Sequence, residues 1–175
     1  MHLTALWLCS VMTLLFTSIG AAAPTSQPAT QPTTQPVQQA DDGILLLHAR
    51  SVTIHGNMVR YEPNPHKNTV GFWTKKEDWV SWDFVVTHPG KFDMLPLQGC
   101  GKGSGGALVD FSIDGEQTLE MTVQETGGFQ NFLERNIGTV ELPAGSHTLE
   151  VKPQTKPGNA VMDLRQVTLK PVESK

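Results

Sequence analysis

Histidines and carboxylates are the side chains of this chain that could do acid–base or metal chemistry. No His-Glu-x-x-His or Gly-x-Ser-x-Gly motif occurs, nor a cysteine–histidine pair with an orienting acid. The histidines after the N-terminal segment also lack the paired spacing of a zinc site: His48, His55, His66, His88 and His147. The sequence therefore predicts no metal, no cofactor and no nucleophile.

Four carboxylates fall on strand positions that we expect to face solvent: Asp93, Asp110, Asp114 and Glu120. Paired acids can meet in space without leaving a sequence signature, so a glycosidase-type pair stays open. Nothing in the spacing favours one, and we predict that the protein is not an enzyme.

The glycine-rich segment 99–106 invites comparison with a phosphate-binding loop. Lys102 is followed by Gly103 rather than by Ser or Thr, and no helix is expected after it. We interpret the segment as a connection between strands.

Aromatic side chains are the remaining candidates for chemistry. Trp79 and Trp82 are three apart in an expected strand, so they face opposite sides of a sheet and one of them belongs in the core. Trp73 follows Gly-Phe and precedes Lys75 and Lys76. A loop tryptophan is equally consistent with ligand binding and with packing.

The elements around these residues are short strands that alternate apolar and polar side chains, separated by glycine, proline and aspartate turns. No window has helical periodicity. We predict an all-β domain, a two-sheet sandwich or jelly roll of about eight strands. The expected strands are 44–50, 80–86, 91–97, 107–114, 118–123, 137–142, 147–152 and 161–169.

The chain divides into four parts by composition. Residues 1–23 are an apolar run ending in small residues, which predicts a cleaved signal peptide; a membrane anchor is the alternative. Residues 24–42 carry a proline at every fourth position from Pro24 to Pro36, typical of an extended linker. Residues 43–171 form the sandwich and residues 172–175 a tail. We expect a secreted, periplasmic or cell-surface protein.

Charge and cysteine content narrow the partners. The net charge is −4, and the few basic residues are scattered, so no nucleic acid and no membrane contact beyond export are expected. Export would remove Cys9 and leave Cys100 without a partner for a disulfide, as a buried small residue or a free thiol.

A family resemblance rests on five motifs that occur in order. They are Asp-Trp-Val-Ser-Trp (78–82), Pro-Gly-Lys-Phe (89–92), Phe-Ser-Ile-Asp-Gly (111–115), Thr-Gly-Gly-Phe-Gln-Asn-Phe (126–132) and Leu-Pro-Ala-Gly-Ser-His-Thr-Leu (142–149). This succession resembles the jelly-roll carbohydrate-binding modules of families 6 and 35 and their galactose-binding-like relatives. It is most similar to the sandwich domain appended to secreted bacterial sulfatases and glycosidases.

The resemblance implies a sugar site and argues against a calcium site. In those modules two glutamates one residue apart help to hold calcium, but His48 and Arg50 stand at the matching positions, and Asp163 alone is not a site. Ligands there lie against loop aromatics beside an asparagine or acid. The matching residues here are Trp73, Phe129 and Asn159, which the resemblance implies bind the ligand.

Two functions follow from these observations. The first is a non-catalytic carbohydrate-binding module, exported, that holds a polysaccharide or glycan. The alternative is a protein-docking or structural sandwich that packs on a secreted sulfatase or glycosidase. An exposed aromatic cluster around one concavity would favour the first, and a flat apolar patch the second.

Export gives the first testable prediction. Mass spectrometry of the product of an exporting cell should show a new N-terminus between Gly20 and Ala23, because the apolar run ends there in small residues. A membrane-bound chain that still begins at Met1 would contradict the cleavage.

Overall fold

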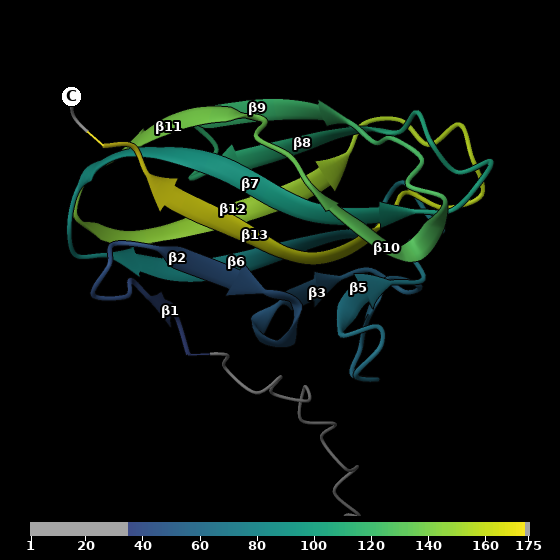
Figure 1. The fold of residues 1–175 in the computed structure, drawn as a ribbon, viewed down its shortest axis with the longest axis horizontal. Helices are drawn as coiled ribbons and strands as arrows, with labels where there is room; N and C mark the ends of the chain where they lie inside the picture. The colour runs from purple at the N-terminus through teal and green to yellow at the C-terminus, as the bar shows by residue number, and fades with distance from the viewer. Residues whose placement is uncertain (1–34, 174–175) are drawn as a thin grey trace, which may run out of the picture. The chain divides into compact units, whose positions relative to one another are not determined.

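The structure is a computed structural model, and it describes residues 35–173. These residues form two facing antiparallel sheets, with one parallel pair, and a single 3₁₀ turn, η1 (Ala49–Ser51) (Figure 1). The expected two-sheet β-sandwich is confirmed. Within the described range no helix is long and apolar enough to cross a membrane.

The first sheet has β6 at its centre, paired with β12 on one side and with β1 and β3 on the other. Beyond β12 come β8 and β9. The strands of this sheet are β1 (Val37–Gln38), β3 (Thr53–His55), β6 (Trp79–Val86), β8 (Leu108–Ile113), β9 (Gln117–Thr122) and β12 (Gly145–Pro153).

The second sheet is organised around the long antiparallel pair of β7 and β13. On the far side of β7 lie β10 and β11, and on the far side of β13 lie β2 and β5, with β4 at the edge. The strands of this sheet are β2 (Leu45–His48), β4 (Arg60–Glu62), β5 (Thr69–Gly71), β7 (Gly90–Cys100), β10 (Gly128–Glu134), β11 (Gly138–Leu142) and β13 (Asp163–Pro171).

Thirteen strands in the described range exceed the expected eight. All eight expected segments contain a strand; β1, β3, β4, β5 and β10 are the additional ones. Four of these five have only two or three residues, too short for alternation to identify them. β1 also lies inside the range 24–42 that we assigned to the linker. Its residues Val37 and Gln38 pair with Phe84 and Val85 of β6, so this part of the predicted linker belongs to the sheet.

The core follows the period-two alternation of the strands. Trp82, Phe84, Phe92 and Phe111 are its largest fully buried side chains together with Trp73. Trp82 donates its indole Nε1–H to the His48 carbonyl at 2.9 Å, so its one polar group is satisfied. Cys100 is buried and free, and burial raises the pKa of its thiol to about 11.

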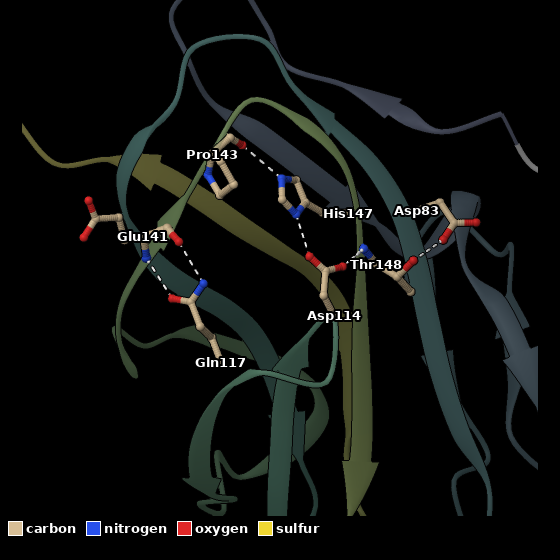
Figure 2. Close-up of polar contacts among 7 residues, drawn as sticks. All are labelled: Asp83, Asp114, Gln117, Glu141, Pro143, His147 and Thr148. Carbon is tan, nitrogen blue, oxygen red and sulfur yellow. Dashed lines mark hydrogen bonds and ion pairs between the residues drawn. The ribbon is translucent and has the colours of Figure 1, made fainter.

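A polar cluster holds the end of the sandwich that lies at the left in Figure 1 (Figure 2). Both ring nitrogens of His147 face oxygen acceptors, Asp114 Oδ2 at 2.6 Å and the Pro143 carbonyl at 3.0 Å. Asp114 Oδ1 accepts from the Thr148 amide at 2.8 Å, which ties the β8–β9 turn to β12. The expectation that Asp114 simply faces solvent is therefore incomplete: its carboxylate is a structural acceptor.

The same end carries a side-chain link between the two sheets. Gln117 on β9 donates its amide to the Glu141 carbonyl at 2.7 Å and accepts from the Glu141 N–H at 3.0 Å (Figure 2). The side-chain amide of Gln117 thus pairs with the backbone of the edge strand β11 as the backbone of a neighbouring strand would.

The contrast between Trp82 and Trp79 gives a stability test. Trp82→Ala should lower the free energy of unfolding by about 3–5 kcal/mol, because it empties a fully buried site and leaves the His48 carbonyl without its donor. Trp79→Ala, three residues along the same strand but partly exposed, is the matched control and should cost less than half as much. Urea unfolding measures both, and equal losses would contradict the assignment.

Candidate functional site

A cleft of about 250 Å³ lies at the end of the second sheet opposite the polar cluster, at the right in Figure 1. Two phenylalanines line it, Phe72 after β5 and Phe129 on β10. Its other lining residues are Glu62, Lys67, Thr74, Gln130, Ala160 and Asp163. Two aromatic rings with carboxyl, amide, ammonium and hydroxyl groups between them are suited to a polar ligand that has an apolar face.

Phe72, and not Trp73, is the aromatic residue that the 71–74 segment presents to the cleft. Phe72 is 42% exposed, whereas Trp73 is fully buried. Ordinary alternation from the buried Val70 would turn Phe72 inward and Trp73 outward. A left-handed φ of +53° at Phe72 breaks the alternation and exchanges the two side chains. The prediction that Trp73 is the sugar platform is therefore wrong.

Asp78 holds this reversed segment in place. Trp73 donates its Nε1–H to the Asp78 carbonyl at 2.8 Å. The Asp78 carboxylate accepts from the backbone N–H groups of Asn57 (3.2 Å), Met58 (2.8 Å) and Val59 (2.9 Å). Burial opposes ionisation, but these three bonds and Lys75 outweigh it, so the pKa of Asp78 is lowered. One residue thus fixes both the turn before β4 and the loop after β5.

Phe129 lies against a glycine surface of β7. A Cβ built on Gly101 would come within 2.7 Å of the Phe129 ring, and one on Gly99 would collide with the Phe129 carbonyl. The two glycines of the 99–106 segment therefore allow β10 to approach β7 and set the ring at the mouth of the cleft. We expected Phe129 on a loop; it lies on the strand β10.

Glu62 and Asp163 place two carboxyl groups on the wall of the cleft. A Cβ on Gly71 would meet both Glu62 Oε2 and Asp163 Oδ1, so both oxygens border the same glycine. Lys67 Nζ pairs with Glu62 Oε1 at 2.8 Å. Asp163 is 5% exposed, and burial together with the Glu62 charge raises its pKa to about 7, with the Gln130 amide and Lys67 opposing the shift.

Asn159 is exposed and does not line the cleft, although its neighbour Ala160 does. The polar positions inside the cleft belong instead to Glu62, Lys67, Thr74, Gln130 and Asp163. Phe129 is thus the one predicted site residue that the cleft contains. Sequence reasoning missed Phe72 and Glu62; the neighbouring Gly71, which leaves space for a close approach, was the available signal.

The positions that match the calcium ligands of related modules do not suit a cation here. His48 Nδ1 accepts from the Arg50 backbone N–H at 3.0 Å, and burial and the Arg50 and Arg165 charges lower the pKa of His48. Arg165 donates to the carbonyls of His66 (3.1 Å) and Lys67 (2.9 Å). A guanidinium, which is itself a cation, ties down the loop before β5, so the residues present do not fit calcium.

Two other places on the surface do not combine available aromatic rings with polar side chains as the cleft does. A larger hollow of about 710 Å³ lies near Gln39, His88 and Pro171, but its one aromatic residue, Phe92, is buried in the core. On the open face of the first sheet the Trp79 ring stacks on His55 at 3.6 Å, and Lys152 lies 4.2 Å from its centroid. These neighbours come from strands on either side of β6, so the indole has no free face.

The fold and the cleft are those of a sandwich-type ligand-binding module, and comparison with known proteins agrees. The family model described as carbohydrate binding module (family 35) matches residues 61–163, which include every lining residue of the cleft. The chain belongs to this family. No curated protein matches the chain in sequence.

Solved structures show the same fold at low identity. The C-terminal family 6 module of LamC, a marine laminarinase from Zobellia galactanivorans, is 22% identical, with a TM-score of 0.57 over 73% of this chain and 98% of that one. A family 35 module from Clostridium thermocellum is 15% identical, with a TM-score of 0.59 over 71% and 97%. A module from Cellvibrio mixtus lichenase 5A, solved with cellotriose, is 18% identical, with a TM-score of 0.56 over 73% and 97%.

The raised pKa of Asp163 predicts a pH-dependent stability. The folded state keeps a proton up to about pH 7 that the unfolded state releases near its ordinary pKa, so stability falls as pH rises between these values. Asp163→Asn should therefore raise the melting temperature at pH 8, by an amount on the order of 5 °C, and change it little at pH 4.

Calorimetric melting from pH 4 to pH 8 measures this difference. Asp41→Asn, at an exposed acid, is the control and should have no pH-dependent effect. A constant offset between Asp163→Asn and the natural chain at every pH would contradict the assignment.

Proposed function

We propose that this carbohydrate-binding module acts without catalysis, by holding a saccharide ring against Phe72 and Phe129 in the cleft. The observation that supports it is the cleft itself, where two phenylalanine rings and several hydrogen-bonding side chains, among them Glu62, Gln130 and Asp163, line one cavity. A pyranose has an apolar face that packs on an aromatic ring, while its hydroxyls need oriented amides and carboxyls.

The exposed Phe72 ring already has cations beside it, and Lys67 Nζ, which lines the cleft, lies 5.7 Å from the ring centroid. The Arg60 guanidinium lies 3.4 Å from the ring centroid but does not line the cleft. The cation holds the exposed ring in one orientation, so less conformational freedom is lost when a ligand binds.

The polar groups of the cleft support binding rather than glycoside hydrolysis. Glu62 is engaged by Lys67, and both carboxyls lie on the same wall, beside Gly71. A glycosidase instead places its two carboxyls on either side of the scissile bond.

Export and a place beside an enzyme remain part of the proposal. A mannanase from Podospora anserina named as GH26-CBM35 shares the fold over 29% of its own chain, with a TM-score of 0.52 and 15% identity. Such an arrangement supports an accessory role, in which this module keeps an exported glycosidase or sulfatase at its polysaccharide. Residues 1–34, which would carry the signal and most of the linker, lie outside the described residues.

Truncation of the two rings tests the site. Phe129→Ala and Phe72→Ala should each weaken binding by about 1.5–3 kcal/mol, roughly ten- to a hundredfold, because each removes an anchor ring. A glycan array with the purified chain finds the ligand, and calorimetry measures the affinities. Both proteins should stay folded, since neither ring is fully buried.

The matched control is Leu133→Ala, on the same strand as Phe129 and 49% exposed, which should leave affinity unchanged. If binding survives both phenylalanine substitutions, the saccharide is held elsewhere on the module and this site assignment is wrong.

A further inference from the structure

The carboxyl wall of the cleft has unused hydrogen-bonding capacity. Among residues 35–173, Asp163 Oδ1 has no hydrogen-bond partner, and Asp163 Oδ2 has only the Gln130 amide at 3.4 Å. Glu62 Oε2 likewise has no partner there, because Lys67 binds Oε1. Both oxygens border Gly71 at the cleft wall and have acceptor capacity that the described residues do not use, so they can accept hydrogen bonds from a ligand.

The charge balance of the cleft distinguishes between donors. Its ionisable lining residues are Glu62, Asp163 and Lys67, an excess of one acid when Asp163 is ionised. The Glu62 charge opposes ionisation of Asp163. An ammonium offers three N–H donors and a positive charge, so it can take the place of the proton that the folded state otherwise keeps on Asp163 up to about pH 7, whereas a neutral hydroxyl cannot. An anionic sugar would add to the repulsion.

The rings add to the preference for a cation. An ammonium near Phe72 or Phe129 is attracted by the negative face of the ring, as Arg60 at 3.4 Å and Lys67 Nζ at 5.7 Å from the Phe72 centroid already are. A hexosamine combines the two requirements, because its pyranose ring presents an apolar face and its amine is attached directly to that ring.

Building on the proposed function, we propose that the cleft selects an amino sugar with a free amine, such as a glucosamine unit, whose ammonium binds Glu62 Oε2 and Asp163 Oδ1. Gly71 makes room for these two oxygens, since any larger residue would place a Cβ against both. N-acetylation removes the positive charge and two of the donors, so an acetylated sugar loses this interaction.

Three tetrasaccharides with the same β-1,4 backbone test the preference: tetra-glucosamine, tetra-N-acetylglucosamine and cellotetraose. Calorimetry with the purified chain in EDTA at pH 6.5 should show tetra-glucosamine binding at least ten times more tightly than the other two. Asp163→Asn and Glu62→Gln should each reduce that preference to less than about threefold.

Asp41→Asn controls for general attraction of a cationic oligosaccharide to an acidic protein, since it removes one charge far from the cleft, and it should keep the full preference. Equal affinity for the three ligands, or a preference that Asp163→Asn leaves intact, overturns the amino-sugar assignment.

The proposed function has a separate readout. If a neutral glycan binds as tightly as its amine-bearing analogue, and Phe129→Ala abolishes that binding, the ring site is supported and only the amino-sugar inference is refuted. A preference for tetra-glucosamine that Phe129→Ala does not affect, but Asp163→Asn abolishes, supports the ion pair and refutes the ring platform.

Discussion

The carboxylate of Asp78 is the constraint on which the binding end of this module depends. The carboxylate accepts hydrogen bonds from three successive backbone N–H groups, those of residues 57 to 59. The backbone carbonyl of Asp78 accepts a hydrogen bond from the Trp73 indole. Gly56 is required beside it, because a Cβ there would collide with the Asp78 side chain. Charge-assisted bonds of this kind are roughly twice as strong as neutral ones.

The consequence of this anchor is the placement of the cleft residues. With Trp73 held in the core, the chain has to reverse at Phe72, and that reversal exposes a phenylalanine where a strand would bury it. The fixed turn at 56–59 leads directly into β4, which carries Arg60 behind the ring and Glu62 at the carboxyl wall. Burial of a tryptophan thus stabilises a locally unfavourable backbone that serves binding.

The cleft shows a conflict between stability and binding at Asp163. A buried carboxyl beside a second acid is unfavourable for folding near neutral pH, as its raised pKa shows. Near His48 and Arg50 the charged groups have hydrogen-bond partners instead. The Arg165 guanidinium donates to a backbone carbonyl there, and the positive charges lower the pKa of His48. The cleft thus holds an unfavourable pair of acids, whereas the charged groups beside it have partners. Such a local departure from favourable pairing is expected of a functional site.

The sequence by itself determined the sandwich, because period-two alternation and turn residues define strands wherever a segment is long enough to show them. It also determined the burial of one of the two tryptophans in the Asp-Trp motif, and it singled out Phe129, which lines the cleft. Only the tertiary structure decided that Phe72 lines the cleft in place of Trp73, because one left-handed φ at Phe72 exchanges the facing of these two side chains. The carboxyl pair was equally invisible, since Glu62 and Asp163 are about a hundred residues apart in the chain and meet only through the pairing of β4 with β5 and of β5 with β13.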